Sequence, residues 1–390
     1  MPWNVMEEFM AVSRKSFIRI LGGGLVVAAG VAVAVPRLDA MPAVAVEGWR
    51  GPGPEEADPR RRALAWALLA PNPHNLQSWA VDLSRPDTIM LHVDATRLLP
   101  QTDPFSRQIL IGHGCFLEIL AMAAAADGYR ADITLFPDGD WTLDKPVARI
   151  VLTKEPGIAV DPLFVQVPRR RTVKGRFEAR MLDPAHTAAL LAGHRNPALP
   201  LAIVDEPGKV DRLRTLAIAG SELEMNTVRT HKESIDVARI GAAEIATHRD
   251  GISLKGPMIW ALRQTGQMTP EKAMTPGTLA WNGGRDYTLS GYGSARAFGW
   301  IASGDNTRTT QIAVGRSYVR LQLAATSLGV ALQPHSQTLQ EYPEMADLRA
   351  AVHRETGTPD GATLQMFFRL GYAGDPGPSP RRLLQSFVTV

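Results

Sequence analysis

Two long, almost uniformly apolar segments dominate the hydrophobic pattern of the chain. They are FSRQILIGHGCFLEILAMAAAADGY, residues 105–129, and TTQIAVGRSYVRLQLAATSLGVALQP, residues 309–334. Neither alternates like a strand, and both are too long for one, so each predicts a long helix that is buried on most of its sides. Glycine, a common helix stop, closes the two helical stretches at Gly128 and Gly329.

A shift of 201 positions places one of these segments on the other. Arg107 then meets Arg308, and Gly114 meets Gly315. Shorter runs with strand-like or helical periods surround both segments in a similar order. We therefore expect an α+β fold of two homologous halves in one chain, a pseudo-dimer that meets along its central long helices. The runs that predict the shorter elements are a helix ending near residue 70, strands in 80–95, 130–141, 145–155, 199–207 and 362–373, and helix in 211–247.

These patterns suggest domain boundaries. We expect an export signal in 1–45, an exposed linker in 46–59, a first half in 60–160 and a second half in 161–390. Residues 250–305 are rich in Gly, Pro, Thr and Trp without a clear period, which favours a lid-like insertion within the second half.

The first 45 residues have the layout of an export signal. Arg14, Lys15 and Arg19 precede a Gly- and Ala-rich apolar run, and the step Ala43-Val44-Ala45 could be cut. SRKSFIR resembles the twin-arginine export motif, with Lys15 in place of the second arginine. The expected location is periplasmic or otherwise extracytoplasmic; the alternative is an uncleaved anchor helix, and we expect membrane contact only through this segment.

Charge and cysteine content narrow the function further. The net charge is +3, and +2 without residues 1–45, which is too small to favour nucleic acid as a partner. Cys115 is the one cysteine, so no intramolecular disulfide can form. The chain has no P-loop, no H-E-x-x-H and no G-x-S-x-G motif, and its nine histidines lack metal-ligand spacing.

Three segments carry candidate chemistry. APNPHNLQSW, residues 70–79, is rich in amides, which donate and accept hydrogen bonds at once. RRRTVK, residues 169–174, and PSPRR, residues 378–382, offer the forked guanidinium donors that suit a phosphate. Each has a plainer interpretation: the amides could satisfy their own backbone in a turn, and the arginines could form a solvated basic face.

Together the three segments resemble motifs of the nitroreductase-like flavoproteins, and the single-chain arrangement resembles their Acg-like branch. The resemblance implies one bound FMN per chain, because the amide loop and the arginine tail each occur once. By position it assigns the phosphate to Arg170, Arg171, Thr172 and Lys174, closed by Arg381 or Arg382 beside Pro380. It places Asn75 and Gln77 at the flavin ring and ribityl chain, and Gly329–Pro334, including Leu332, behind the ring.

The expected function is that of an exported FMN oxidoreductase acting on a quinone, a nitro compound or a similar small acceptor. The flavin would do the chemistry, so we assign no catalytic side chain and no metal. One alternative is a protein that sequesters FMN under a lid, with Trp260, Trp281 or Trp300 over the ring. Another has no flavin, and its arginines bind an acidic protein. Since two fused halves need no partner, we expect a monomer.

Overall fold

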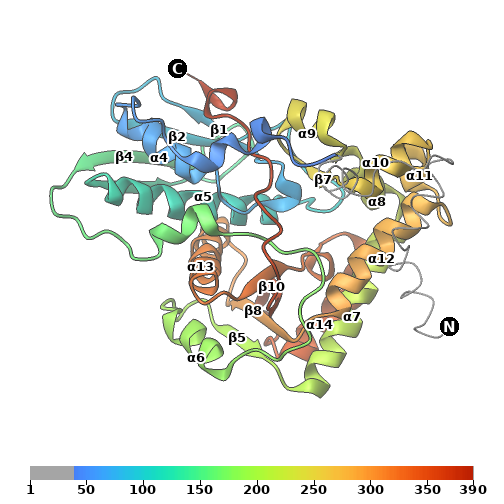
Figure 1. The fold of residues 1–390 in the computed structure, drawn as a ribbon. Helices are drawn as coiled ribbons and strands as arrows, with labels where there is room; N and C mark the ends of the chain where they lie inside the picture. The colour runs from blue at the N-terminus through green and yellow to red at the C-terminus, as the bar shows by residue number, and fades with distance from the viewer. Residues whose placement is uncertain (1–38, 390) are drawn as a thin grey trace.

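The computed structural model describes residues 39–389, so most of the expected export signal lies outside the described residues. Two α+β halves meet along helices α5 and α13, and a mostly helical insertion lies to one side of both (Figure 1). The first half contains α4 (Pro59–Ala67), β1 (Trp79–Asp82), β2 (Thr88–Val93), α5 (Arg107–Ala126), β3 (Tyr129–Leu135) and β4 (Ala148–Lys154). The second half contains α6 (Pro184–Gly193), β5 (Leu201–Val204), β8 (Ala297–Ser303), α13 (Arg308–Ser327), β9 (Ala331–Pro334), α14 (Ala346–Thr356) and β10 (Thr363–Gly371).

The two halves share one topology. The first sheet has the order β1-β2-β4-β3 and the second has the order β5-β8-β10-β9, and all of these pairs are antiparallel. In each half the long helix connects the second strand in chain order to the third: α5 connects β2 to β3, and α13 connects β8 to β9. Helices α5 and α13 begin 201 residues apart and have the same length. The expected α+β fold of two related halves around paired central helices is confirmed.

The central helices approach so closely at two glycines that no side chain fits between them. A Cβ on Gly114 would lie 2.1 Å from the Ile312 carbonyl oxygen, and one on Gly315 would lie 1.9 Å from that of Ile111. The Cys115 Sγ donates to the Gly315 carbonyl oxygen at 3.1 Å. These two glycines are the pair that the 201-residue shift matches, so the repeat places its smallest residues at its own interface.

Helix α5 is apolar enough to cross a membrane by composition, with a mean hydropathy of 1.9, yet 83% of that window is buried inside the protein. Its neighbours are α4, α13 and the first sheet, whose apolar residues share one core with it. Its apolar surface is therefore covered by protein, as expected for a core helix.

The insertion between β5 and β8 is more regular and longer than the sequence predicted. It contains α7 (Pro207–Asn226), α8 (Val228–Asp236), β6 (Ala238–Ile240), α9 (Ala242–His248), β7 (Ile252–Leu254), α10 (Pro257–Gln264), α11 (Pro270–Met274) and α12 (Leu279–Gly293). The boundaries 250–305 are wrong, because residues 297–303 form β8, a fully buried inner strand of the second sheet. Periodicity failed there because a strand buried on both faces does not alternate.

The C-terminal tail returns from the second half to the first. After β10 the chain crosses both halves, passes through the 3₁₀ helix η7 (Leu384–Ser386), and adds β11 (Val388–Thr389) parallel to β1 (Figure 1). The boundary at 161–390 is therefore wrong in its last residues, since they complete the sheet of the first half.

The expected linker is also partly wrong. Residues Ala43–Arg50 form the 3₁₀ helix η2, and Ala45 is fully buried with its carbonyl oxygen accepting the Arg381 N–H at 2.8 Å. A cut at the step Ala43-Val44-Ala45 would fall inside this packed segment. We call residues 43–50 the N-terminal strap.

Replacing Gly315 by alanine should separate the two central helices. The added methyl group would overlap the Ile111 carbonyl, and neither backbone can move without disturbing the shared core, so we expect a loss of about 1–3 kcal/mol in the free energy of unfolding. Urea titration followed by circular dichroism measures this.

Gly284→Ala is the matched control, because Gly284 lies inside α12 with open space around it. That variant should keep or slightly raise stability, by up to about 1 kcal/mol, since alanine favours helix. Equal destabilisation of both variants would contradict the close crossing.

Candidate functional site

The amide loop, residues 70–79, has an unusual backbone. His74, Asn75 and Gln77 have φ values of 48°, 56° and 54°, in the left-handed region that side chains other than glycine rarely adopt. Asn72 closes the loop on itself, because its Oδ1 accepts the Gln77 N–H at 2.8 Å. The plainer interpretation, an asparagine satisfying the local backbone, therefore holds for Asn72. Contacts beyond the loop must stabilise the other left-handed residues.

Those contacts come from the C-terminal tail. Asn75 donates from Nδ2 to the Pro380 carbonyl at 3.1 Å, and its Oδ1 accepts from Arg381 Nη1 at 2.7 Å. Gln77 is fully buried, and its Oε1 accepts the Arg382 N–H at 2.8 Å. The two amides thus fasten the tail of the second half to the loop of the first.

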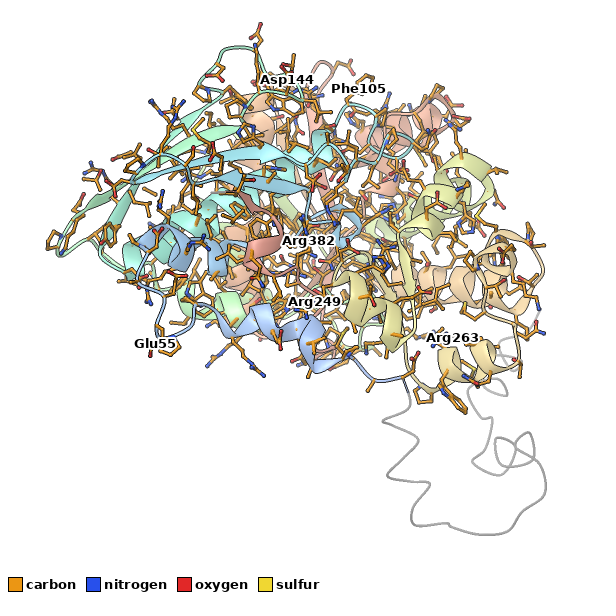
Figure 2. The ribbon with its side chains drawn as sticks, turned by 90° about the horizontal axis from the view of Figure 1, so that it is seen from above. Glu55, Phe105, Asp144, Arg249, Arg263 and Arg382 are labelled. Carbon is orange, nitrogen blue, oxygen red and sulfur yellow. The ribbon has the colours of Figure 1, made fainter. Side chains whose placement is uncertain are left out.

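The same loop is pinned to the insertion. Gln77 donates from Nε2 to the Arg249 carbonyl at 3.0 Å, and the Gly251 N–H donates to the Asn75 carbonyl at 3.0 Å. Arg249 and Arg382 accordingly lie near each other, each bonded to Gln77 through its main chain (Figure 2). A cleft of about 210 Å³ opens beside this junction, lined by Leu76, Thr96, Arg97, Leu98, Val237, Arg239, His248 and Asp250.

Three arginines from both ends of the second half meet next to the amide loop. We call Arg170, Arg171 and Arg381 the arginine cluster. Arg170 and Arg381 are 2% exposed, and each donates from Nη2 to the Leu69 carbonyl, at 2.9 and 3.2 Å. Leu69 lies just beyond the C-terminal end of α4, where the helix dipole makes carbonyl oxygens better acceptors for cations.

The cluster has an excess of positive charge. Burial lowers the pKa of Arg170 to about 10, and burial followed by repulsion from Arg170 and Arg171 lowers the pKa of Arg381 well below its usual range. The carboxylate paired with the cluster is Asp375, 3.4 Å from Arg171 Nε and 68% exposed. The Nε atoms of Arg170 and Arg381 are buried without a hydrogen-bond partner among the described residues.

Gln322 of α13 connects three residues of the cluster segment by hydrogen bonds. Its Oε1 accepts from Arg170 Nη1 at 3.3 Å, and its Nε2 donates to the Arg171 carbonyl at 3.1 Å and to Thr172 Oγ1 at 3.3 Å. Thr172 therefore lies beside the cluster, and its role at a phosphate stays a prediction. Lys174 is exposed and outside these contacts.

The structure separates the two tail arginines. Arg382 donates to the carbonyls of Gln77 and Ser386, at 2.9 and 2.8 Å, and lies 3.6 Å from Asp94. It holds the tail in place, whereas Arg381 joins the cluster. Leu332 is buried in the core, with its carbonyl oxygen 3.5 Å from the Val173 nitrogen that donates to it.

Sequence reasoning missed Arg369, which shapes the segment after the cluster. This fully buried arginine donates from Nη2 to the carbonyls of Lys174 and Gly175, at 2.9 and 2.6 Å, and from Nε to Gln333 Oε1 at 2.6 Å. The available signal was a lone charge inside the apolar strand MFFRLGY. It also missed Gln322 and Trp49, which no motif marks.

His74 and His335 are two isolated histidines, and burial favours the neutral form of each ring. Burial lowers the pKa of His74 to about 4, with a further contribution from Lys174, and lowers that of His335 to about 3. Both rings are therefore neutral at physiological pH. Trp300, in β8, packs in a separate apolar cluster formed by residues of the insertion and of the second sheet, such as Leu213 and Phe367. It therefore lies away from the arginine cluster.

His335 belongs to a second buried polar group, between α7 and the segment after β9. Neither of its ring nitrogens has a partner among the described residues, and its Nε2 lies beside Gly220 of α7. Glu224, one helical turn later, accepts from Gln340 Nε2 at 2.6 Å, and burial raises its pKa to about 7. The group is polar, buried and incompletely satisfied.

Comparisons with known proteins find relatives of low identity over most of the chain. No family model matches the chain. It is 26% identical over 350 residues to the "Putative NAD(P)H nitroreductase Rv3131" of Mycobacterium tuberculosis (strain ATCC 25618 / H37Rv), covering 85% of this chain and 92% of that protein. It is 35% identical over 78 residues to the "Putative NAD(P)H nitroreductase acg" of the same strain, covering 20% of this chain and 23% of that protein.

Among solved structures, the FMN-dependent nitroreductase NfnB from Mycobacterium smegmatis in complex with NADPH matches with a TM-score of 0.35 and 20% identity. The match covers 57% of this chain and 94% of that one. The sequence similarity over most of the chain agrees with the nitroreductase-like resemblance that the three motifs suggested.

Replacing Asn75 by glycine should release the tail. Glycine tolerates the left-handed backbone, so the variant removes the two hydrogen bonds to Pro380 and Arg381 without adding strain. We expect a loss of about 1–3 kcal/mol in stability and faster amide hydrogen exchange in residues 380–389. Asn282→Gly, on the exposed face of α12, is the control and should leave exchange in the tail unchanged. Equal protection of the tail in both variants would contradict the role of Asn75 in holding the tail.

Glu224 should make stability depend on pH. Its folded pKa of about 7 lies above the usual 4.5, so its contribution is present below pH 4.5 and is lost as the pH rises through 7. Between pH 5 and 8 the wild type should lose up to about 3 kcal/mol relative to Glu224→Gln, as measured by urea unfolding.

Glu344→Gln serves as the control, since the Glu344 carboxylate is exposed and paired with Arg229. That variant should keep the wild-type trend. If Glu224→Gln also keeps it, the carboxyl of Glu224 does not titrate in this range.

Proposed function

We propose that this chain is an FMN-binding oxidoreductase of the nitroreductase type. The observation that carries the proposal is the arginine cluster, in which, among residues 39–389, the Nε atoms of two buried guanidiniums have no partner and no buried carboxylate neutralises them. Such a site fits a phosphate monoester, because charged forks and a dianion form bonds about twice as strong as neutral ones. The similarity to proteins named nitroreductases supports FMN as the molecule that carries this phosphate.

The residues of this chain would divide the work of holding the cofactor. Arg170, Arg171 and Arg381 would bind the phosphate, with Thr172 beside them. Asn75 and Gln77 hold the tail so that Arg381 stays within reach of the phosphate. Contacts of their amides with the flavin ring stay a prediction. Lys174 and the segment around Leu332 stay candidates for contacts farther along the cofactor. When bound, FMN supplies the transfer of hydride or electrons.

We propose a quinone, a nitro compound or a similar small molecule as the acceptor. The names of the curated relatives point to a nicotinamide donor. Export through the N-terminal signal stays part of the proposal, and nicotinamide donors are scarce outside the cytoplasm, so a different donor would then be needed there. The fused halves favour a monomer.

One complete site per chain follows from the asymmetry of the repeat. The segment after α6, residues 194–200, has no counterpart of the amide loop, and the first half has no arginine tail. The cluster also needs residues from both ends of the second half and a loop from the first. We therefore propose a stoichiometry of one FMN.

A second candidate function is FMN sequestration with little turnover. It is favoured by the insertion, which is pinned to the amide loop through Arg249 and Gly251 and so could limit access to a flavin. Anaerobic mixing of the flavin-loaded protein with NADPH and then a quinone separates the two functions. Rapid bleaching and reoxidation support the oxidoreductase. A flavin that NADPH leaves oxidised and that, once reduced with dithionite, is not reoxidised by the quinone supports sequestration.

The visible spectrum of the purified protein is the first test of both. Bound flavin absorbs near 450 nm, as flavins do in general (~450 nm), and a colourless protein that ignores added FMN would leave an acidic protein partner as the role of the arginines.

Arg171→Ala should weaken FMN binding by about 1.5–3 kcal/mol, because it removes one partly buried charged donor from the phosphate. Fluorescence titration of FMN and riboflavin measures this, and riboflavin, which lacks the phosphate, should be unaffected. Arg212→Ala is the control, since Arg212 lies in α7, is 60% exposed and pairs with Glu355 of α14. Equal FMN affinity in the Arg171 variant and the control would refute the phosphate assignment.

A further inference from the structure

The N-terminal strap places an indole ring against the arginine cluster. The Trp49 ring centre lies 4.5 Å from the guanidinium carbon of Arg171, 4.9 Å from that of Arg381 and 5.8 Å from that of Arg170. Its Nε1 donates to the Ser379 carbonyl at 2.7 Å, which fixes the ring on the tail. One indole ring therefore lies within cation–π distance of three cations.

We propose that Trp49 is a further residue of the anion site, which acts by holding the three guanidiniums together for a phosphate monoester. The inference rests on the proposed function of the cluster. Trp49 is a positioning residue: it would stabilise the cations through its ring rather than bind the phosphate itself.

The chemistry of the two groups makes their roles complementary. A guanidinium attracts an aromatic face through its charge and its own flat surface, while its N–H donors point outward in its plane. The ring can thus offset part of the repulsion among Arg170, Arg171 and Arg381 without consuming the donors that an oxyanion needs. The Nε atoms of Arg170 and Arg381, for which the described part of the chain supplies no partner, are such donors.

The strap is held by contacts that do not involve the ring. The Ala45 carbonyl accepts the Arg381 N–H at 2.8 Å, and Glu47 pairs with Arg249 at 3.2 Å. Gly48 lies so close to Leu68 and Arg381 that a Cβ there would come within 2.9 and 3.1 Å of their side chains. The strap, drawn in blue, runs between Glu55 and Arg249 (Figure 2). A variant that lacks the indole should keep the strap in place.

The test compares ligands with and without a phosphate. In Trp49→Ala we expect FMN to bind at least about 10-fold more weakly, and in Trp49→Phe about 3-fold more weakly, since the smaller ring keeps part of the interaction. Riboflavin should bind all three proteins equally. Inorganic phosphate should slow amide hydrogen exchange in residues 43–50 of the wild type, and this effect should be lost in Trp49→Ala.

The matched control is Trp141→Ala. Trp141 also has an arginine over its ring, with Arg308 at 5.4 Å, but it lies in the loop between β3 and β4. That variant should bind FMN like the wild type. Circular dichroism and the unfolding midpoint confirm that each variant is folded, and Trp49→Phe decides the matter if the alanine variant is not.

The outcomes separate the inference from the proposed function. If Arg171→Ala weakens FMN while both Trp49 variants bind it as tightly as the wild type, or more tightly, the role of Trp49 is wrong and the phosphate site stands. If riboflavin weakens as much as FMN in the Trp49 variants, the ring does not act through the phosphate. A wild type that binds neither FMN nor inorganic phosphate overturns both.

Discussion

The approach of α5 to α13 at Gly114 and Gly315 is the constraint on which the rest of the structure depends. Each glycine leaves its backbone within contact of a carbonyl on the other helix, a distance that any side chain would prevent. The two related halves therefore share one core, which includes residues of both central helices and both sheets. Because the halves cannot separate, segments from opposite ends of the chain are brought to a common place with little freedom.

That common place needs the tail as much as the helices. β11 pairs with β1 in the sheet of the first half, and the residues just before it carry Arg381 and Arg382 past the amide loop. The left-handed residues of the loop are stabilised by these same contacts. Loop, tail and strap thus form one unit, in which the backbone conformation of each segment depends on the others.

The sequence was informative where a repeated pattern carried the signal. The 201-residue shift predicted both central helices, their closing glycines and the matching order of strands. The motifs marked Arg170 and Arg171 and left the tail residue open between Arg381 and Arg382. It was uninformative where a residue acts through a distant partner. Trp49 lies in a stretch with the composition of a linker, and nothing local shows that its ring meets three arginines.

The boundaries of the insertion failed for a related reason. Strand β8 has no alternation because both of its faces are buried, and its neighbours are rich in Gly and Thr, so a buried strand resembled irregular chain. Likewise, Arg381 and Arg382 are adjacent and identical in type. Only the direction of their side chains, toward Leu69 in one case and toward Gln77 and Ser386 in the other, assigns them different roles.

The arginines of the chain are compensated in different ways, and the difference bears on what the cluster is for. Arg97 and Arg239 are partly buried and both pair with Asp250, and Arg97 also lies 3.2 Å from Asp94, so each of them has a carboxylate partner. Arg170 and Arg381 donate instead to main-chain and amide oxygens, above all to the Leu69 carbonyl.

A carbonyl dipole lowers the cost of burying a guanidinium, yet it leaves the unit charge uncompensated. A carboxylate in the same place would stabilise the folded chain and would also compete with any anion. Solvation by carbonyls, with the Trp49 ring within 4.5–5.8 Å of the guanidinium carbons, keeps the positive charge available for a ligand. Arg369 is also buried without a carboxylate partner, but each of its guanidinium nitrogens donates to an oxygen. The Nε atoms of Arg170 and Arg381 have no partner among the described residues, and this unused donor beside an uncompensated charge is what argues for a binding role.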